Sequence, residues 1–224
     1  MIAGDARPVA PPTDAVLTDE GLTATGAANP AGRVLVIGCG ALAREILALI
    51  RANGMAHVDL TCLPAILHNR PERIAPALEA AILGQGAGYD SIFVAYADCG
   101  SGGEIAKVCA RHGAEMIEGP HCYSFFEGNA RFAETGEVTS FYLTDFLTRQ
   151  FDAFVIKPLG LDRHPQLRDL YFGNYEKLVY LAQTDDPALD ARAEAAANRL
   201  GLAYERRFTG FGDLAAAMAG LPGR

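Results

Sequence analysis

The fold of this chain is indicated most clearly by residues 33–54, which read RVLVIGCGALAREILALIRANG. The run VLVIG is apolar and rich in β-branched residues, as in a buried strand, and the turn after it leads into an amphipathic helical stretch that ends at Gly54. From Arg33 onward, short apolar runs of this kind alternate with helical stretches. This alternation predicts an α/β fold, a parallel sheet with helices on both faces.

The same criteria predict the secondary structure of the rest of the chain. The other predicted strands are HVDLTCL (57–63), SIFVAYA (91–97), AEMIE (114–118), KLVYLAQT (177–184) and AYERRFTG (203–210). Residues 128–175 have a mixed, aromatic-rich pattern that predicts short helices and loops. Residues 1–32 are rich in Pro, Ala, Thr and Gly without a sustained period, so we expect a disordered N-terminal tail. Residues 33–224 then form an α/β domain of Rossmann-like βα units, divisible into two or three small subdomains around a shared cleft.

Composition and charge argue against several classes of partner. The chain has 224 residues, is 50% hydrophobic and carries a net charge of −8 without a basic stripe, which argues against nucleic acid and anionic membranes. No apolar run reaches the roughly 18 residues of a membrane span, and no signal-peptide pattern begins the chain. We therefore expect a cytoplasmic protein whose five cysteines are reduced, metal-bound or catalytic.

Three cysteines stand where an apolar run gives way to a turn marked by glycine or proline. They are Cys39 in VIGCGALAREI, Cys99 in AYADCGSGGEI and Cys122 in EGPHCYSFFEG. Turns at the carboxyl ends of parallel strands share one crevice, so the three thiols are predicted to bind one metal centre there. The first two segments align cysteine on cysteine, which makes them candidates for a pseudo-repeated cysteine turn. Structural cysteines and a reactive thiol without metal remain alternatives.

Two metal centres suit three thiolate ligands. Zinc prefers four ligands, so three cysteines leave one position open for water or substrate. An iron–sulfur cluster held by three cysteines likewise leaves one iron open as a Lewis acid. Because the cysteines come from separate turns and no C-x-x-C pair occurs, we favour a 4Fe–4S cluster and keep zinc as the alternative.

Polar residues near these turns are candidates for contacts with a substrate or cofactor. His68 and His121 are suited to proton transfer, and His121 is also a candidate fourth ligand. Arg70 is suited to binding a small anionic substrate, and with the two histidines it completes the set of predicted catalytic residues. Surface loop and turn positions are the alternative for these side chains. The predicted cofactor contacts are Gly38, Gly40, Asn69 and Gly100.

A competing motif overlaps the first cysteine turn. The segment GCGALA fits the G-x-G-x-x-A form of the dinucleotide fingerprint, directly after a strand and at a helix start. Asp59 follows about 20 residues later, where a ribose-binding carboxylate is expected. The motif therefore supports an alternative function, an oxidoreductase that binds NAD or another nucleotide through Gly38 and Gly40. A purely structural role is the alternative: the same pattern is expected if the two glycines only allow a tight turn and close packing of the helix.

The chain resembles the domain of unknown function 1638 family in four segments: GCGALARE, LPAILHNRPERI, VAYADCGSGG and the later Pro-His-Cys turn. Members share an N-terminal cysteine turn, a Leu-His-Asn segment, a Tyr-Gly-x-Cys-Gly turn and an Asp-Cys turn. Here Ala97 replaces a glycine and His121 replaces the aspartate. The resemblance covers Arg33 to the C-terminus and implies a cysteine-centred site. Because members often sit beside corrinoid-dependent methyl-transfer genes, it also implies a place in one-carbon metabolism, as an enzyme or as a non-catalytic accessory protein that contacts a corrinoid methyltransferase.

Overall fold

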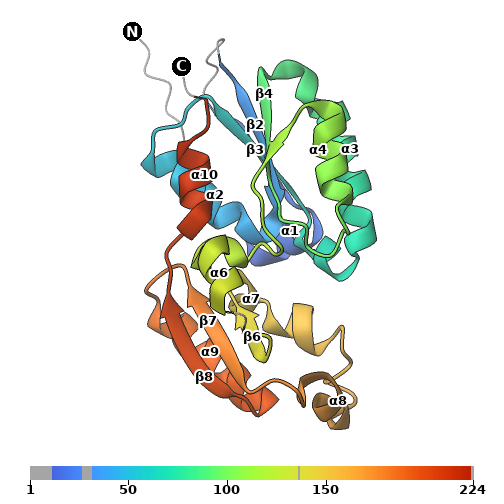
Figure 1. Ribbon diagram of the computed structural model, residues 1–224, viewed down its shortest axis with the longest axis vertical. Coiled ribbons are helices and arrows are strands. Elements are labelled where there is room, and N and C mark those ends of the chain that lie inside the picture. The colour runs from blue at the N-terminus through green and yellow to red at the C-terminus, as the bar shows by residue number, and fades with distance from the viewer. Residues whose placement is uncertain (1–11, 27–31, 136, 223–224) are drawn as a thin grey trace.

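The computed structural model describes residues 12–26, 32–135 and 137–222, and their strands form two sheets (Figure 1). Sheet A has the strand order β1-β3-β2-β4-β5, and sheet B has the order β6-β7-β8. Every strand pair is parallel except β1 with β3, which is antiparallel. The α/β class is confirmed. The strands are divided between two sheets, however, and do not join in the single parallel sheet that was predicted.

Sheet A carries helices on both faces. Its strands are β1 (Leu22–Ala24), β2 (Val34–Cys39), β3 (Val58–Leu63), β4 (Ser91–Ala95) and β5 (Glu115–Met116). Helices α2 (Ala43–Ala52) and α10 (Gly212–Ala219) lie together on one face, and α3 (Ile74–Gln85) and α4 (Glu104–His112) lie together on the other (Figure 1). The helix predicted after the first strand is present as α2. It ends at Ala52, two residues before the predicted end at Gly54.

Strand β2 is the centre of sheet A, because all six of its residues are buried and both of its neighbours pair with it in parallel. The chain passes from β2 to β3 on one side and then crosses to β4 on the other. The sheet thus has a topological switch point between the carboxyl ends of β2 and β4, where open α/β sheets bind ligands. Cys39 ends β2, and Cys99 lies four residues after the end of β4.

Sheet B contains β6 (Ser140–Leu143), β7 (Lys177–Ala182) and β8 (Ala203–Phe208). Helices α7 (Asp145–Arg149) and α9 (Pro187–Leu200) pack on one face. On the other face Tyr142, Val179 and Leu181 form a small apolar cluster with Tyr123 and Phe132. Three more short α-helices are α5 (Ser124–Glu127), α6 (Asn129–Thr135) and α8 (Arg168–Phe172). Strand β6 corrects the prediction of only short helices and loops for residues 128–175, because its partner β7 stabilises a strand that the local pattern does not show.

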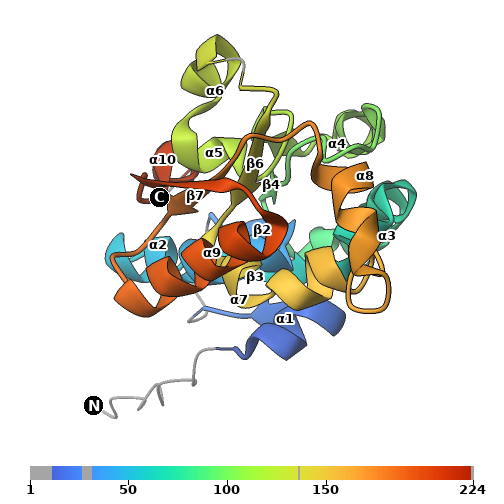
Figure 2. The same cartoon turned by 90° about the horizontal axis from the view of Figure 1, so that it is seen from below.

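Part of the N-terminal segment belongs to the core, so the predicted disordered tail is wrong for residues 14–24. Helix α1 (Asp14–Asp19) buries Leu17 completely, and β1 pairs with β3. Asp14 forms ion pairs with Arg44 of α2 and Arg149 of α7, and Figure 2 shows α1 beside α7. Segments this short are stable because of tertiary contacts, which a local pattern does not reveal. Residues 1–11 and 27–31 lie outside the described residues.

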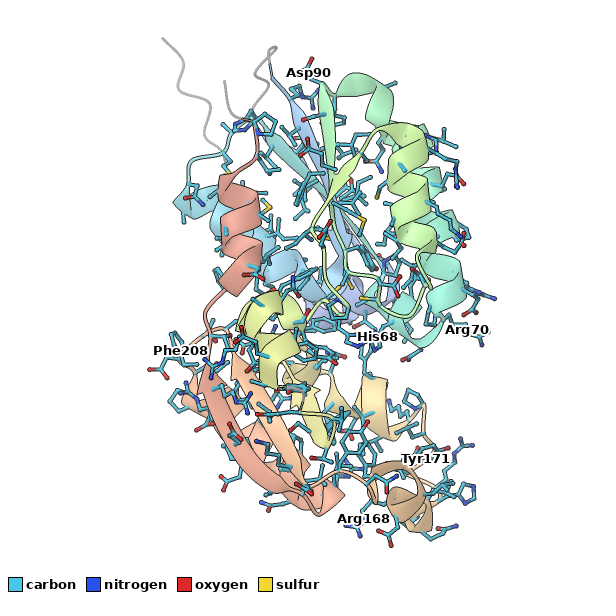
Figure 3. The ribbon with its side chains drawn as sticks, viewed as in Figure 1. His68, Arg70, Asp90, Arg168, Tyr171 and Phe208 are labelled. Atoms are coloured by element: carbon cyan, nitrogen blue, oxygen red, sulfur yellow. The ribbon has the colours of Figure 1, made fainter. Side chains whose placement is uncertain are left out.

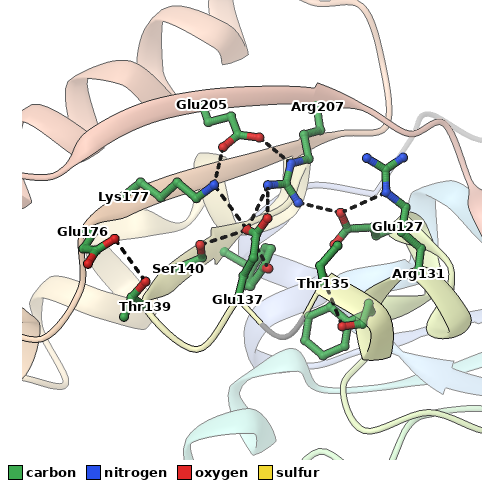
Figure 4. A network of polar contacts seen from close by, with 12 residues as sticks. Glu127, Arg131, Thr135, Glu137, Thr139, Ser140, Glu176, Lys177, Glu205 and Arg207 are labelled. Atoms are coloured by element: carbon green, nitrogen blue, oxygen red, sulfur yellow. Dashed lines mark hydrogen bonds and ion pairs between the residues drawn. The ribbon is translucent and has the colours of Figure 1, made fainter.

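A network of charged side chains connects β8 to the segment around α5 and α6 (Figure 4). The Arg207 guanidinium donates to Glu127, Glu137 and Glu205 at 2.6–2.7 Å. Lys177 adds an ion pair to Glu205 at 2.6 Å. Isolated surface ion pairs contribute little, but Arg207 and Glu127 are largely removed from water and share partners, so breaking this network leaves charges without compensation. The segment that follows Cys122 is thereby held on sheet B.

Candidate functional site

A small pocket of about 40 Å³ lies where the carboxyl ends of the two sheets meet. Cys39 at the end of β2, Tyr96 just after β4 and Thr144 just after β6 all line it. Cys99 and Cys122 also line it, so the three predicted cysteines reach one pocket. Most of the other lining side chains are apolar, and no Lys, Arg, Asp or Glu among the described residues takes part. The pocket is therefore largely apolar and rich in thiols.

Cys39 owes its position to the tight turn between β2 and α2. Its backbone is extended, and its sulfur accepts the N–H of Ala41 at 3.4 Å. A Cβ on Gly40 would lie 2.3 Å from the Leu17 carbonyl oxygen, so only glycine fits beneath α1. Burial raises the pKa of the Cys39 thiol to about 11, which keeps it protonated at neutral pH unless a metal replaces the proton.

Cys99 is held in a strained turn by its neighbour Asp98. Its φ is +47°, and no other non-glycine residue in the described ranges has a positive φ. The Asp98 carboxylate accepts the N–H of Gly103 at 2.6 Å and the hydroxyl of Ser101 at 2.9 Å, and these bonds lower the pKa of Asp98. Strain of this kind is often found at functional sites. Here it directs the Cys99 side chain into the pocket.

Backbone pairing brings Cys122 to Cys99. The N–H groups of Asp98 and Cys99 donate to the carbonyls of Gly119 and Pro120 at 3.0 and 3.1 Å. The two sulfurs consequently lie 3.1 Å apart. The hydrogen bond from the Cys122 thiol lowers the pKa of Cys99, whereas the same bond and burial raise the pKa of Cys122. Cys99 is therefore the thiol of this pair that ionises first.

The two predicted histidines both line the pocket. His121 stacks on Tyr123 at 4.9 Å between ring centroids, and Tyr123 stacks in turn on Tyr142 at 5.3 Å. His68 is exposed at the rim and lies between the two sheets (Figure 3). Partial loss of solvation lowers the pKa of both imidazoles, so each is mainly neutral at pH 7. Neutral imidazoles are suited to accepting or donating a proton.

Other predicted residues lie elsewhere. Asn69 and Arg70 are exposed and do not line the pocket, and Figure 3 shows Arg70 on the outer surface of sheet A's part of the molecule. Gly38 and Gly100 are also outside the lining: a Cβ would approach Ile46 at 3.0 Å and Pro71 at 3.5 Å respectively. These positions argue against direct contact with a ligand in the pocket, because other residues form its lining.

Asp59 lies at the opposite end of the strands from the Gly38–Gly40 turn. It pairs in register with Leu35, whereas Cys39 pairs with Leu63. The Asp59 carboxylate forms an ion pair with Arg33 and accepts the hydroxyl of Tyr89 at 2.8 Å. These contacts give the buried Asp59 carboxylate a structural role. Its position at the far end of the strands is not the place where a ribose would lie.

Two polar residues of the pocket were missed by the sequence interpretation. Tyr96 was assigned only to a strand, and its hydroxyl has no partner among the described residues. Thr144 lies in a region without a clear pattern, and its hydroxyl caps α7 by accepting the N–H of Leu147 at 3.2 Å. A Thr before Asp145 is a recognisable helix start, so Thr144 was detectable as a cap but not as part of a pocket.

The cysteines of the pocket do not meet the requirements of a site for a single metal ion. In the part of the chain that the structure describes, no three His, Cys, Asp or Glu side chains are grouped so as to hold one metal ion. Thiolates around a tetrahedral zinc ion lie about 3.8 Å apart, given Zn–S bonds of about 2.3 Å. The Cys99 and Cys122 sulfurs, 3.1 Å apart, are closer together than this. The described side chains therefore do not form a site for a single zinc ion as they stand.

Fold and pocket together define an α/β protein with three cysteines at one strand-end pocket. The family model described as "Protein of unknown function (DUF1638)" matches residues 62–218, and the chain belongs to this family. Cys99 and Cys122 lie within the match, and Cys39 precedes it. No curated protein and no solved structure shows significant similarity to the chain. No helix in the described ranges is long and apolar enough to cross a membrane.

Proposed function

We propose that Cys39, Cys99 and Cys122 bind an iron–sulfur cluster with one open iron, and that the protein is an enzyme that uses this centre. The observation that carries the proposal is that three cysteines from three separate turns line one pocket. The pocket lies at the switch point of sheet A, where ligands bind in folds of this type. Rossmann-like βα units would supply the first two thiols, since Cys39 ends β2 and Cys99 lies four residues after the parallel strand β4. The backbone is extended at Cys39 and left-handed at Cys99, so a pseudo-repeated cysteine turn has no support from the local conformation.

A cluster suits this pocket better than a single zinc ion. The ligands of a single ion must surround one point, and no such set is present among the described residues. In a cluster each thiolate binds a different iron, so the ligand sulfurs need not be adjacent. Loading then requires the Cys99 and Cys122 side chains to turn apart from their present 3.1 Å separation. Zinc remains the alternative that the metal analysis below tests.

The residues of the pocket suggest how such a centre would act. When bound, a cluster with an open iron supplies a Lewis acid that polarises a substrate oxygen. His121 and His68 are mainly neutral and are placed to transfer a proton at the rim. The apolar walls exclude water, which strengthens these interactions. Since Arg70 lies outside the pocket, the charge of a small anionic substrate would be met by the iron. We therefore favour a lyase or transferase reaction.

Two further functions have weaker support. A role in corrinoid-linked methyl transfer, as an enzyme or accessory protein, rests on the family resemblance alone. A nucleotide at the Gly38–Gly40 turn is disfavoured by two observations: Leu17 covers Gly40, and Asp59 is at the far end of the strands. We accordingly place the metal centre first.

The deciding experiment is purification without oxygen, followed by metal and sulfide analysis and an absorption spectrum. We expect about four iron and four sulfide per chain, as in a cubane cluster. Cys39→Ser, Cys99→Ser and Cys122→Ser should each lose the cluster, because an alkoxide is a poor ligand for iron in such a centre. Cys109→Ser is the matched control, since Cys109 is buried in α4 outside the pocket and should leave the cluster intact. Zinc without sulfide, no metal at all, or equal loss in the control would each overturn the proposal.

A further inference from the structure

The Cys99 and Cys122 side chains meet in the pocket, with their sulfurs 3.1 Å apart. Both are free thiols in this structure. The sulfurs of a disulfide are about 2.05 Å apart, so these two must approach by roughly 1 Å more to form one. Rotation about the χ1 torsions of the two cysteines supplies a movement of this size. The pair is therefore close to the arrangement that a disulfide requires.

The backbone keeps the two cysteine turns side by side. The N–H groups of Asp98 and Cys99 donate to the carbonyls of Gly119 and Pro120, so two consecutive hydrogen bonds join the segments just before the two thiols. The Asp98 carboxylate also accepts the N–H of Gly103 at 2.6 Å, which fixes the turn that follows Cys99. The short distance between the sulfurs thus depends on hydrogen-bonded backbone, and we expect it to persist in solution.

The pocket determines which oxidants reach the pair. It measures about 40 Å³, whereas one water molecule needs about 10–15 Å³ on such a measure, so only a molecule of a few atoms fits. No Lys, Arg, Asp or Glu of the described ranges lines it, which favours an uncharged molecule. Cys122 is only partly buried, so the pair is open to small molecules. Hydrogen peroxide meets these requirements, and a bulky charged disulfide such as oxidised glutathione does not.

We propose that Cys99 and Cys122 form a reversible dithiol, which hydrogen peroxide oxidises to a disulfide in the metal-free protein. One sulfur attacks a peroxide oxygen, the O–O bond breaks, and a sulfenic acid and one water form. The other sulfur then attacks the sulfenic sulfur, the S–S bond forms, the S–O bond breaks and a second water leaves. The two thiols lose two electrons and two protons, and the peroxide is reduced to two waters. This inference concerns the chain without metal and does not depend on the proposed function.

The test maps the bond by mass spectrometry. The full-length chain is reduced, freed of metal with a chelator, treated with one equivalent of hydrogen peroxide, alkylated and digested with trypsin. Each of the five cysteines falls in a separate tryptic peptide. We expect peptide 74–107, which contains Cys99, to be joined to peptide 112–131, which contains Cys122. The number of free thiols should fall from five to three, and dithiothreitol should restore all five.

Two controls separate the pair from general thiol oxidation. Cys109→Ser is the matched variant, because Cys109 is buried in α4 outside the pocket, and it should form the cross-link as the wild type does. Cys122→Ser should not form it. In urea the wild type should lose its selectivity for this pair, because the pairing depends on the fold. The peptide map of the wild type is decisive even where a variant fails to fold.

Several results would overturn the inference. These are five thiols that stay free, sulfinic acids on unlinked cysteines, a bond from Cys99 to Cys39, and a bond between two chains. A protein that forms the predicted cross-link but never acquires a cluster would support this inference and overturn only the proposed function. A protein that acquires the cluster but forms no cross-link in its metal-free state would do the reverse.

Discussion

Replacing Leu17 by alanine tests whether the N-terminal segment is part of the fold and of the site. Leu17 is completely buried in α1, and its carbonyl covers the Gly40 turn that positions Cys39. Truncation of a buried leucine to alanine removes apolar burial and leaves a cavity, which costs about 2–5 kcal/mol. For a chain of this size a loss of about 3 kcal/mol lowers the midpoint of thermal unfolding by roughly 6–12 °C.

The measurement is thermal unfolding followed by circular dichroism, with urea unfolding as a second determination. Leu83→Ala is the matched control, because it makes the same chemical change at a leucine that is 69% exposed on α3. We expect the control to change the free energy of unfolding by less than about 0.5 kcal/mol. If Leu17→Ala is no more destabilising than Leu83→Ala, then α1 does not belong to the core and the placement of Cys39 needs another explanation.

Three more substitutions test the hydrogen bonds, the close packing and the buried carboxylate of the core. Asp145→Ala removes a carboxylate that accepts from Tyr180, from the Gln183 N–H and from the N–H and hydroxyl of Thr184, so urea unfolding should show a loss of about 3 kcal/mol or more. Gly40→Ala places a Cβ against the Leu17 carbonyl and should cost about 1–3 kcal/mol in the same assay. Burial raises the pKa of Glu45 to about 7, so the folded state keeps a proton that the unfolded chain releases near 4.5. The free energy of unfolding should therefore fall by about 3 kcal/mol as the pH rises from about 4.5 to about 7, and Glu45→Gln should remove that fall.

Each of these three predictions has an outcome that would contradict it. An Asp145→Ala protein as stable as the wild type would mean that water replaces the carboxylate at the four donors. A neutral Gly40→Ala would show that α1 moves away from the turn without cost. For Glu45, stability that rises between pH 5 and 7, or a Glu45→Gln variant with the wild-type pH dependence, would assign the titration to another group.

Local pattern predicted most of the elements of this protein. The apolar runs that begin after Arg33 and after Glu176 correspond to strands β2 and β7, because burial on both faces of a parallel strand leaves a continuous apolar or β-branched run. The three cysteine turns were also recognised, since strand ends marked by glycine or proline are visible in the sequence. Their convergence on one pocket followed from the general geometry of parallel sheets.

Tertiary structure alone decided the rest. Helix α1 and strand β1 depend on Arg44, Arg149 and β3, which are distant in the chain, so their short segments carry no pattern of their own. Arg70 and Tyr96 show the same limit at the site: the arginine has the more suggestive chemistry but is exposed, whereas the tyrosine lines the pocket together with the three cysteines. Periodicity, turns and caps act over a few residues and are written in the sequence. Which side chains meet across two sheets depends on strand order and packing, which only the folded chain determines.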